Sequence, residues 1–497
     1  MRGLYTPLTQ IRREVFIAVS KAAYEGYDLE QYEEIPYQII TGEVPQYRDS
    51  VYRERAIVTE RVRLAMNMDL RPSAVPNASL SYQMDLDALK VKPFTKEQMR
   101  VIPAACNACE EKSFFVSNLC HGCIAHPCMV VCPVGAISLQ NGHAFIDQES
   151  CIKCGKCYQA CPYNSIVKNE RPCVAACGVN AFKKDNLNRA VIDTEACVSC
   201  GQCMVNCPFG AIMDKSQIYQ VISAIQSGVE VSAIVAPAFV GQFGDDVSAE
   251  QVFEGLRQLG FTDVLEVAYG ADFTTVEEAK HYIDHVPNDQ PFLATSCCPA
   301  WVLMAKNELK DKSDYVSPSY SPMGETAKAI KKKFPNTKIC FIGPCSAKKQ
   351  EAASGTASEF VDYVLTFEEL YGMLIAKEID LDSLVVKNRV NDASKDGRGF
   401  AVAGGVAKAV ERTVRQLDPN REILIERAEG LSNCRKMVLM AKVGKRDGYL
   451  LEGMACPGGC VGGAGTIINQ NKANGCVQTY ANQSEVNTAI ETVNRNQ

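Results

Sequence analysis

The chain has 497 residues, a formal net charge of −6 and a hydrophobic fraction of 46%. This length predicts roughly two to four domains, and the mild negative charge gives no indication of nucleic-acid binding or of a basic membrane-binding patch. The sequence has no run of about 18 apolar residues, and its opening residues form no apolar segment. We therefore expect no membrane span, no secretory signal and a cytoplasmic location.

Cysteine is the unusual component, with 24 residues, many of them in C-x-x-C pairs. Disulfides are rare in cytoplasmic proteins, so ligation of metal ions or clusters explains this number better.

Residues 1–100 contain no cysteine and predict a mainly helical N-terminal extension. Thr6 and Pro7 are typical of a helix start, apolar residues between Ile11 and Ala23 follow helical spacing, and Gly26 suits a helix end. A second amphipathic helix is predicted over residues 53–68. Both a packing role and a docking surface fit this extension.

Residues 101–215 contain sixteen cysteines, as many as four [4Fe–4S] clusters with four thiolate ligands each require. The runs that begin at Cys151 and Cys197 have the C-x2-C-x2-C-x3-C-P spacing of bacterial ferredoxins, and the run at Cys120 has two additional residues. Zinc ribbons are the alternative, but four thiolates on one loop suit tetrahedral zinc poorly.

In two-cluster ferredoxins the fourth cysteine of each run ligates the other cluster. The 120–161 unit lies between Cys109 and Cys173, as if inserted into a second ferredoxin, so we predict a nested, ferredoxin-like α+β domain. The four predicted ligand groups are Cys120, Cys123, Cys128 and Cys161; Cys151, Cys154, Cys157 and Cys132; Cys106, Cys109, Cys173 and Cys207; and Cys197, Cys200, Cys203 and Cys177.

Residues 216–497 alternate between strand-like and helix-like segments, which predicts an α/β domain with two mainly parallel sheets flanked by helices. No dinucleotide-binding fingerprint or Walker A motif is convincing in this region. The expected strands are 229–235, 263–267 and 338–342, and the expected helices are 252–259 and 275–284. Residues 400–410 are expected to form a strand–loop–helix junction. The chain is expected to end in a helix and tail.

Three cysteine-containing loops stand out in this domain. They are Thr295-Ser296-Cys297-Cys298-Pro299, Gly343-Pro344-Cys345 with the residues to Glu351, and the segment from Glu452 to Cys460. Together they resemble the three signature stretches of the [FeFe]-hydrogenases, and with residues 462–466 they are closest to the subgroup called group B. The resemblance spans residues 101–466.

The resemblance implies an H-cluster, a [4Fe–4S] cluster bridged to a [2Fe] subcluster that carries CO, CN and an azadithiolate and is built by separate maturases. Spacing alone indicates only a fifth cluster or metal site. The ligands implied by motif position are Cys298, Cys345, Cys456 and Cys460, of which Cys460 also bridges to the subcluster.

The same resemblance implies roles for residues around the cluster. Cys297 would relay protons, since a thiol can donate and accept them, although a buried free thiol is the plain alternative. Lys348 would bond a cyanide ligand, or form only a salt bridge. Met454 and Pro237 would line the pocket, although Met454 suits an ordinary core position almost equally well.

The outer proton path departs from the better-known members of the family. Glu278 and Ser317 match its first glutamate and its serine, whereas His281 stands where a second glutamate is expected. Histidine can also carry protons, and an exposed helical histidine is the alternative. Gly343 and Met323 stand where a methionine and a glutamine are expected.

These features predict an oxygen-sensitive hydrogenase that interconverts protons, electrons and H2. A ferredoxin-like partner would exchange electrons through the four accessory clusters. The alternatives are an H2 sensor or low-activity hydrogenase, a non-catalytic iron–sulfur assembly protein and a polyferredoxin. Retention of Cys297 and Lys348 disfavours the assembly protein, and no oligomeric state is predicted.

Overall fold

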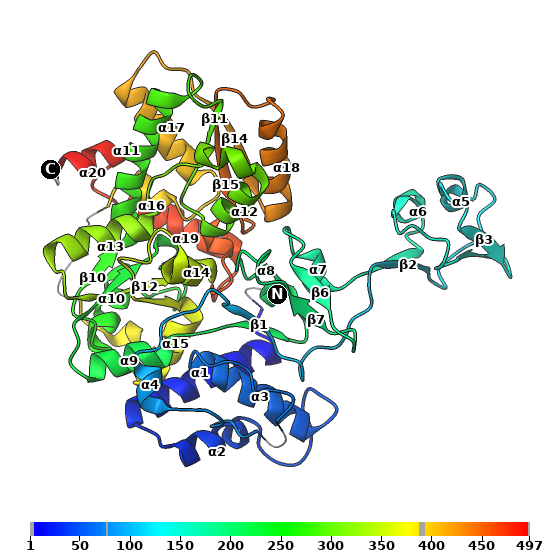
Figure 1. Ribbon diagram of the computed structural model, residues 1–497, viewed down its shortest axis with the longest axis horizontal. Coiled ribbons are helices and arrows are strands. Elements are labelled where there is room, and N and C mark those ends of the chain that lie inside the picture. Colours follow the sequence, from blue (N-terminus) through cyan, green and yellow to red (C-terminus); the bar gives the residue numbers. More distant parts are fainter. Residues whose placement is uncertain (1–3, 76–77, 387–392, 496–497) are drawn as a thin grey trace.

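The structure, a computed structural model, describes residues 4–75, 78–386 and 393–495. A large body contains most of the helices and sheets, and a small lobe projects from one side of it on a narrow stem (Figure 1). No helix in the described ranges is long and apolar enough to cross a membrane.

The N-terminal extension is helical, as predicted. Thr6 caps the first helix by accepting a hydrogen bond from the Thr9 amide at 3.2 Å, and Gly26 ends it in the left-handed conformation at φ 68°. The helix predicted over 53–68 is present with a slightly earlier start and end, and the sequence analysis missed α2. The helices are α1 (Pro7–Glu25), α2 (Leu29–Ile39), α3 (Val51–Ala65) and α4 (Leu86–Lys90).

This extension shares its apolar core with the main body. Helix α1 packs on α9 (Ile218–Gln226) and α15 (Phe367–Ala376). Gly372 of α15 permits the contact, because a Cβ at this position would lie 2.8 Å from the Cβ of Phe16. Phe16 is 1% exposed and belongs to the same cluster as the β9 and β12 side chains.

The cysteine-rich region forms short antiparallel pairs with a short helix in each cluster loop, and one such unit is inserted into another. Strands β1 (Met99–Val101) and β8 (Ile212–Asp214) pair in the body, whereas β2 (Ser113–Val116) and β5 (Ile166–Asn169) form the stem of the lobe. The remaining elements are α5 (Pro127–Val130), β3 (Ile137–Gln140), β4 (His143–Ile146), α6 (Lys156–Ala160), α7 (Pro172–Ala175), β6 (Phe182–Lys184), β7 (Ala190–Ile192) and α8 (Gln202–Asn206).

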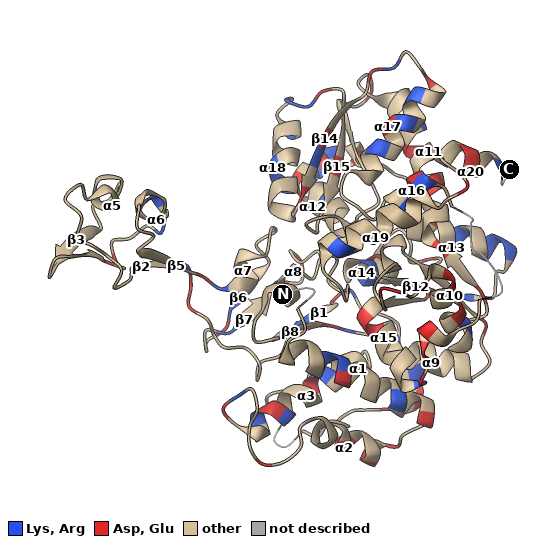
Figure 2. Ribbon diagram, turned by 180° about the vertical axis from the view of Figure 1, so that it is seen from behind, with Lys and Arg blue, Asp and Glu red and all other residues tan. Residues whose placement is uncertain are grey.

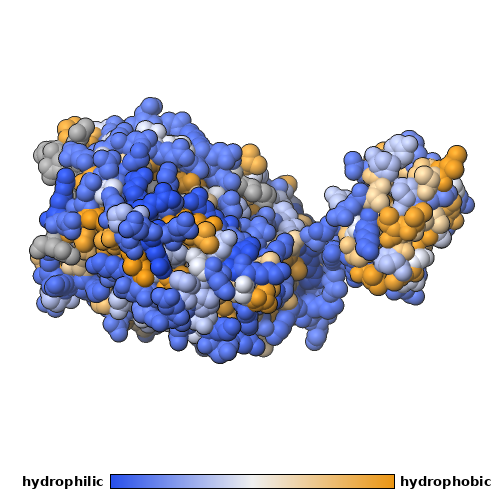
Figure 3. Space-filling view, turned by 90° about the horizontal axis from the view of Figure 1, so that it is seen from above, coloured by the Kyte–Doolittle hydropathy of each residue, from blue (hydrophilic) through white to orange (hydrophobic). Residues whose placement is uncertain are grey.

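The lobe has a small core of its own around Phe114, Ile137 and Ile166. It also exposes many apolar side chains, which cover much of its surface in Figure 3, and Ile124 is 97% exposed. The lobe thus projects from the body as a separately packed unit.

Two parallel sheets carry the rest of the chain, which confirms the prediction of parallel sheets flanked by helices. The first has the strand order β10-β9-β12-β13 and the second β11-β15-β14. Their strands are β9 (Val231–Val235), β10 (Val264–Glu266), β11 (Phe292–Ala294), β12 (Lys338–Gly343), β13 (Tyr363–Thr366), β14 (Leu424–Glu429) and β15 (Tyr449–Met454). The helices are α10 (Ala249–Gln258), α11 (Val267–His285), α12 (Pro299–Leu309), α13 (Pro322–Lys333), α14 (Ala347–Ser354), α16 (Lys395–Gly399), α17 (Gly405–Leu417), α18 (Leu431–Lys442), α19 (Gln470–Asn482) and α20 (Ala489–Arg495).

The strand–loop–helix junction expected at residues 400–410 is wrong. Two helices, α16 and α17, flank a turn there, and Gly404 adopts φ 86° immediately before α17. The apolar run that begins at Phe400 suggested a strand, since a short apolar run does not distinguish a strand from another buried segment. The Phe400 side chain is buried, and it lines a cavity between the two sheets. Helix α11 is also longer than the expected 275–284.

Replacing residues 113–169 with a short glycine–serine linker should leave the body folded. Ser113 and Asn169 are paired across the stem, so the cut ends lie side by side. The thermal midpoint followed by circular dichroism should change by only a few degrees, and bound iron should fall by about eight atoms, the content of two cubane clusters. A collapse of the helical signal would contradict the separate packing of the lobe.

Candidate functional site

The cysteine loops of the α/β region meet because each follows the carboxyl end of a parallel strand, where open α/β sheets bind their ligands. Cys297 and Cys298 come shortly after β11, Cys345 follows β12, and Cys456 follows β15. Strand β12 belongs to the first sheet, whereas β11 and β15 belong to the second. The site is therefore built between the two sheets.

A buried cavity of about 70 Å³ lies at this junction. Its wall is mainly apolar, with Lys348 as its charged side chain. The predicted site residues that line it are Cys297, Cys298, Cys345, Cys460, Lys348, Met454 and Pro237, and Met323, Phe341 and Phe400 add to the apolar wall. Cys456 lies near Cys345 and Cys460, and Glu278 lies near Cys297. Ser317 lies near Glu278.

The four predicted ligand thiols are close enough to influence one another. Burial, followed by the neighbouring Cys298 and Cys456, raises the pKa of Cys460 to about 12. Burial raises the pKa of Cys345 as well, and Cys456 and Cys298 add to that shift. Four neighbouring thiolates would repel one another unless a cationic centre lay among them, so this donor set fits an iron–sulfur cluster.

Among the described residues, no three His, Cys, Asp or Glu side chains are close enough to hold one metal ion. A tetrahedral zinc site would draw four sulfurs to about 2.3 Å from one atom.

A buried carboxyl group stands directly behind Cys297. Glu278 of α11 is fully buried and its Oε1 accepts hydrogen bonds from the Ser296 amide at 2.7 Å and the Ser296 hydroxyl at 2.8 Å. Burial raises the pKa of Glu278 to about 7, although these bonds and the nearby Ser317 hydroxyl lower it. A carboxyl group poised near neutrality can both take up and release a proton.

His281 lies one turn further along α11, away from the cavity. Its ring packs against that of His285 with a centroid separation of 4.4 Å, and His285 Nδ1 lies 2.8 Å from Asp289 Oδ2. Burial, with His285 nearby, lowers the pKa of His281. The structure thus places His281 between the buried Glu278 and the half-exposed His285 on one helix.

Lys348 is held in place by residues that the sequence analysis missed. Its Nζ donates to Glu351 Oε2 at 2.6 Å and to Ser321 Oγ at 2.9 Å. Burial alone would lower the pKa of Lys348, but Glu351 raises it, so the ammonium stays charged. The spacing of Lys348 and Glu351, three residues apart on α14, was the available signal.

The accessory cysteines of three of the four predicted groups lie near one another, and the ligation of all four clusters stays a prediction. Burial, followed by the neighbouring Cys207, raises the pKa of Cys173 to about 11, and Cys106 and Cys109 add to this shift. We call Cys106, Cys109, Cys173 and Cys207 the Cys106 group. Cys197, Cys200 and Cys203 all lie near Cys177 and form the Cys197 group. In the lobe, Cys132 shares a small cavity with Cys151, Cys154 and Cys157.

The Cys197 group adjoins the cavity cysteines directly. Gln202 donates from Nε2 to Cys456 Sγ at 3.2 Å. Burial raises the pKa of Cys200, and Cys456 is the first of the neighbouring thiols that raise it further. Gly201 lets the two loops approach, since a Cβ there would lie 2.4 Å from that of Ala464.

Three further cysteines have no predicted ligand role, and of these Cys434 lies near Cys298 and Cys456. Cys340 and Cys434 are fully buried, and the Cys434 thiol donates to the Ala428 carbonyl at 3.3 Å. Cys476 is half-buried and packs beside Gly241. Their placement agrees with a packing role.

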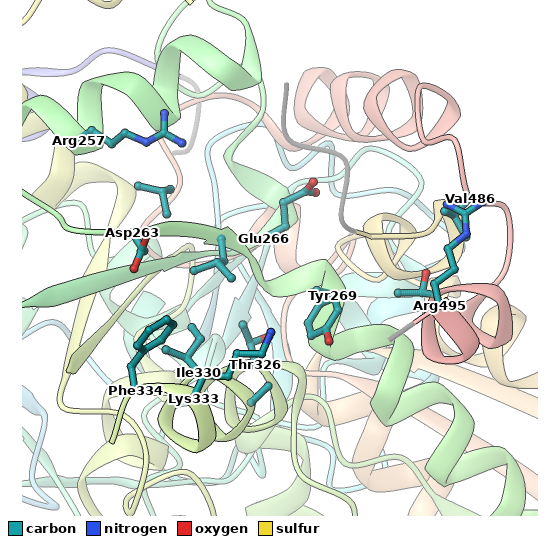
Figure 4. A pocket seen from close by; sticks show the side chains of 14 residues that line it. Arg257, Asp263, Glu266, Tyr269, Thr326, Ile330, Lys333, Phe334, Val486 and Arg495 are labelled. Carbon is teal, nitrogen blue, oxygen red and sulfur yellow. The ribbon is translucent and has the colours of Figure 1, made fainter. Parts of the chain in front are cut away.

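A second pocket, of about 560 Å³, opens at the carboxyl end of β10 (Figure 4). Its labelled side chains include Arg257, Asp263 and Lys333, and none of its 14 described lining residues is a cysteine. It is therefore separate from the cysteine-lined cavity.

Comparisons with known proteins agree with this geometry. Residues 229–464 match the family described as the iron-only hydrogenase large subunit, C-terminal domain, and residues 112–162 and 190–213 match 4Fe–4S cluster-binding domains. Residues 229–464 therefore belong to the [FeFe]-hydrogenase family. The matched segments contain the cavity, most of the lobe and the cysteines of the Cys197 group from Cys197 to Cys203.

Some of the similar proteins are named as hydrogenases and others are not. Iron hydrogenase 1 of Clostridium pasteurianum is 28% identical over 64% of this chain and 64% of its own length, and an NADP-reducing hydrogenase subunit of Solidesulfovibrio fructosivorans is 30% identical over 51% and 53%. Protein NAR1 of Arabidopsis thaliana, whose name states no hydrogenase activity, is 24% identical over 56% and 75%. The alignments thus span less than two thirds of the first two relatives.

An [FeFe]-hydrogenase structure from Chlamydomonas reinhardtii superposes with a TM-score of 0.45 and 22% identity, over 56% of this chain and 93% of that chain.

Glu351→Gln should destabilise the protein by about 3–5 kcal/mol, because it leaves the Lys348 ammonium buried without its counter-charge. The free energy of unfolding, measured anaerobically by denaturant titration, checks this. The control is Glu411→Gln, which removes a partly exposed partner of Arg415 and should cost at most about 1 kcal/mol. Equal effects of the two changes would contradict the role given to Glu351.

Proposed function

We propose that this protein is an [FeFe]-hydrogenase that interconverts two protons and two electrons with H2. The observation that carries the proposal is the convergence of Cys297, Lys348 and Cys460 on one buried apolar cavity. An electron-transfer protein alone would need neither this cavity nor the Glu278 carboxyl group behind it. Membership in group B, a cytoplasmic location and dependence on maturases belong to the same proposal.

Cys298, Cys345, Cys456 and Cys460 would hold the H-cluster, which supplies the metal centre for the redox chemistry when bound. Lys348 would direct its ammonium toward an anionic cyanide ligand, and Glu351 keeps that ammonium charged and oriented. Met454, Pro237 and the other apolar wall residues exclude water, which strengthens each polar contact inside the cavity.

Protons would reach the cavity through Cys297. This thiol is 8% exposed, lines the cavity and has the Glu278 carboxyl group on its other side. Ser317 lies beside Glu278, and His281 would pass protons toward His285 and the surface. The order Cys297, Glu278, Ser317 and His281 is therefore our proposed path.

Electrons would enter from the opposite side. A ferredoxin-like partner would exchange them with the lobe, and the Cys106 and Cys197 groups would connect the lobe to Cys456. The hydrogen bond from Gln202 to the Cys456 sulfur supports this last connection. Hydrogen bonds to ligand sulfurs are among the features that tune cluster potentials.

Infrared spectroscopy of anaerobic protein coexpressed with maturases tests the function most directly. Bands of metal-bound CO and CN are expected, together with about 22 iron atoms, from five cubane clusters and one two-iron unit. Full cubane content without these bands, in a host proven to mature another hydrogenase, would contradict the proposal and favour a non-catalytic iron–sulfur protein.

Cys297→Ala should keep the CO and CN bands and lower H2 turnover by at least about 100-fold, because the first proton carrier is lost. Cys340→Ala is the matched control, since this thiol is also buried but lies outside the cavity. H2 evolution with a chemical reductant measures both variants. If Cys297→Ala turned over as fast as Cys340→Ala, Cys297 would not be the relay.

A further inference from the structure

Three arginines in the described chain reach toward the Cys106 group without a carboxylate partner of their own. They are Arg48 and Arg61 from the N-terminal extension and Arg171 from the start of α7. None of them forms an ion pair among the described residues, and the Nε atom of each is buried without a hydrogen-bond acceptor. A buried guanidinium without an ion-pair partner is costly, so Arg61 and Arg171 favour a further negative group nearby. Arg48 is half-buried and lies near Cys106.

Arg61 is the most deeply placed of the three. It is 1% exposed and donates from Nη2 to the Gly210 carbonyl at 2.5 Å, three residues after Cys207. Burial lowers the pKa of Arg61 to about 10, so the side chain remains cationic at neutral pH. The glycine at 210 is needed for this contact, since a Cβ there would lie 2.6 Å from Arg61 Nη2.

Arg48 and Arg171 approach the same cysteines from other directions. Arg48 lies over the Phe209 ring at 5.3 Å and donates to the Ala105 carbonyl at 3.4 Å, directly before Cys106. Arg171 is 6% exposed and donates to Asn188 Oδ1 at 2.5 Å, and Asn188 in turn donates to the Ala108 carbonyl, directly before Cys109.

The N-terminal extension positions two of these three charges. Helix α3, whose basic residues are blue in Figure 2, packs against β8, the strand that follows Cys207. The Arg61 side chain points from α3 into that contact, whereas Arg55 of the same helix bonds the Ile40 and Gly42 carbonyls. The extension therefore does more than cover apolar surface, because it delivers positive charge to one set of cluster cysteines.

We propose that Arg48, Arg61 and Arg171 form an arginine collar that balances the negative charge of the cluster held by the Cys106 group and raises the reduction potential of that cluster. One-electron reduction adds one negative charge to a thiolate-ligated cluster, and nearby fixed cations stabilise the reduced form. The inference rests on the accessory clusters of the proposed function, but not on H2 turnover.

The test is a potentiometric titration of the full, iron-reconstituted chain with dithionite, followed by electron paramagnetic resonance. Arg61→Gln and Arg48→Gln should each shift the midpoint potential of one accessory cluster to more negative values and leave the others in place. Arg61→Lys, which keeps the charge, should restore most of the shift. Arg55→Gln is the matched control and should move no potential.

Unchanged potentials in both glutamine variants, at full iron content, would overturn the inference. If Arg61→Gln loses the cluster or does not fold, Arg48→Gln decides, because Arg48 is only half-buried and its replacement leaves no buried gap. The function is judged separately, on protein coexpressed with maturases. A potential shift together with absent CO and CN bands and absent H2 turnover in that protein would support the collar and count against the proposed function.

Discussion

Burial of sulfur ligands away from water is the constraint on which the rest of this structure depends. The thiols of Cys298, Cys345 and Cys460 all have pKa values raised by burial, and each raises the pKa of its neighbours further. Such a set becomes stable only with a cationic centre among the thiolates and a rigid frame that prevents their separation. Strand ends from two parallel sheets provide that frame, and the Lys348–Glu351 pair fixes a positive charge beside it.

The same burial separates the electron path of the proposed reaction from its proton path. The electron side is marked by Cys456, which accepts a hydrogen bond from Gln202 of the cluster region. The proton side is marked by Cys297 and Glu278. Cys297 lies in the loop after β11 of the second sheet, and Glu278 lies on α11. Because the cavity wall between them is mainly apolar, neither side offers water a direct route to the other.

Much of this arrangement could be predicted because cluster ligation leaves a local signature in the sequence. The C-x2-C-x2-C-x3-C-P runs and the nested order of the cysteines are enough to indicate the inserted lobe and the ligand groups. Contacts between distant segments leave no such signature. Ser321 is recognisable as a partner of Lys348 only once α13 and α14 are placed, and the arginines of the extension are seen to approach cluster cysteines only when α3 packs on β8. The error at Phe400 has the same origin, since an apolar run reports burial and not the element that is buried.

The ligand groups along the chain differ in how a reduced cluster would be stabilised. In the lobe Cys154 is exposed, so water can screen added charge there. Beside the cavity Cys203 is buried, so water screens added charge less there than at Cys154. Between them, the arginine collar would offer fixed cations in place of water. With the collar in place, the reduced state would be stabilised at the cluster of the Cys106 group. In the proposed electron path this cluster directly precedes the one that adjoins the cavity. The N-terminal extension would then act on catalysis through the supply of electrons, without contact to the site where H2 is formed.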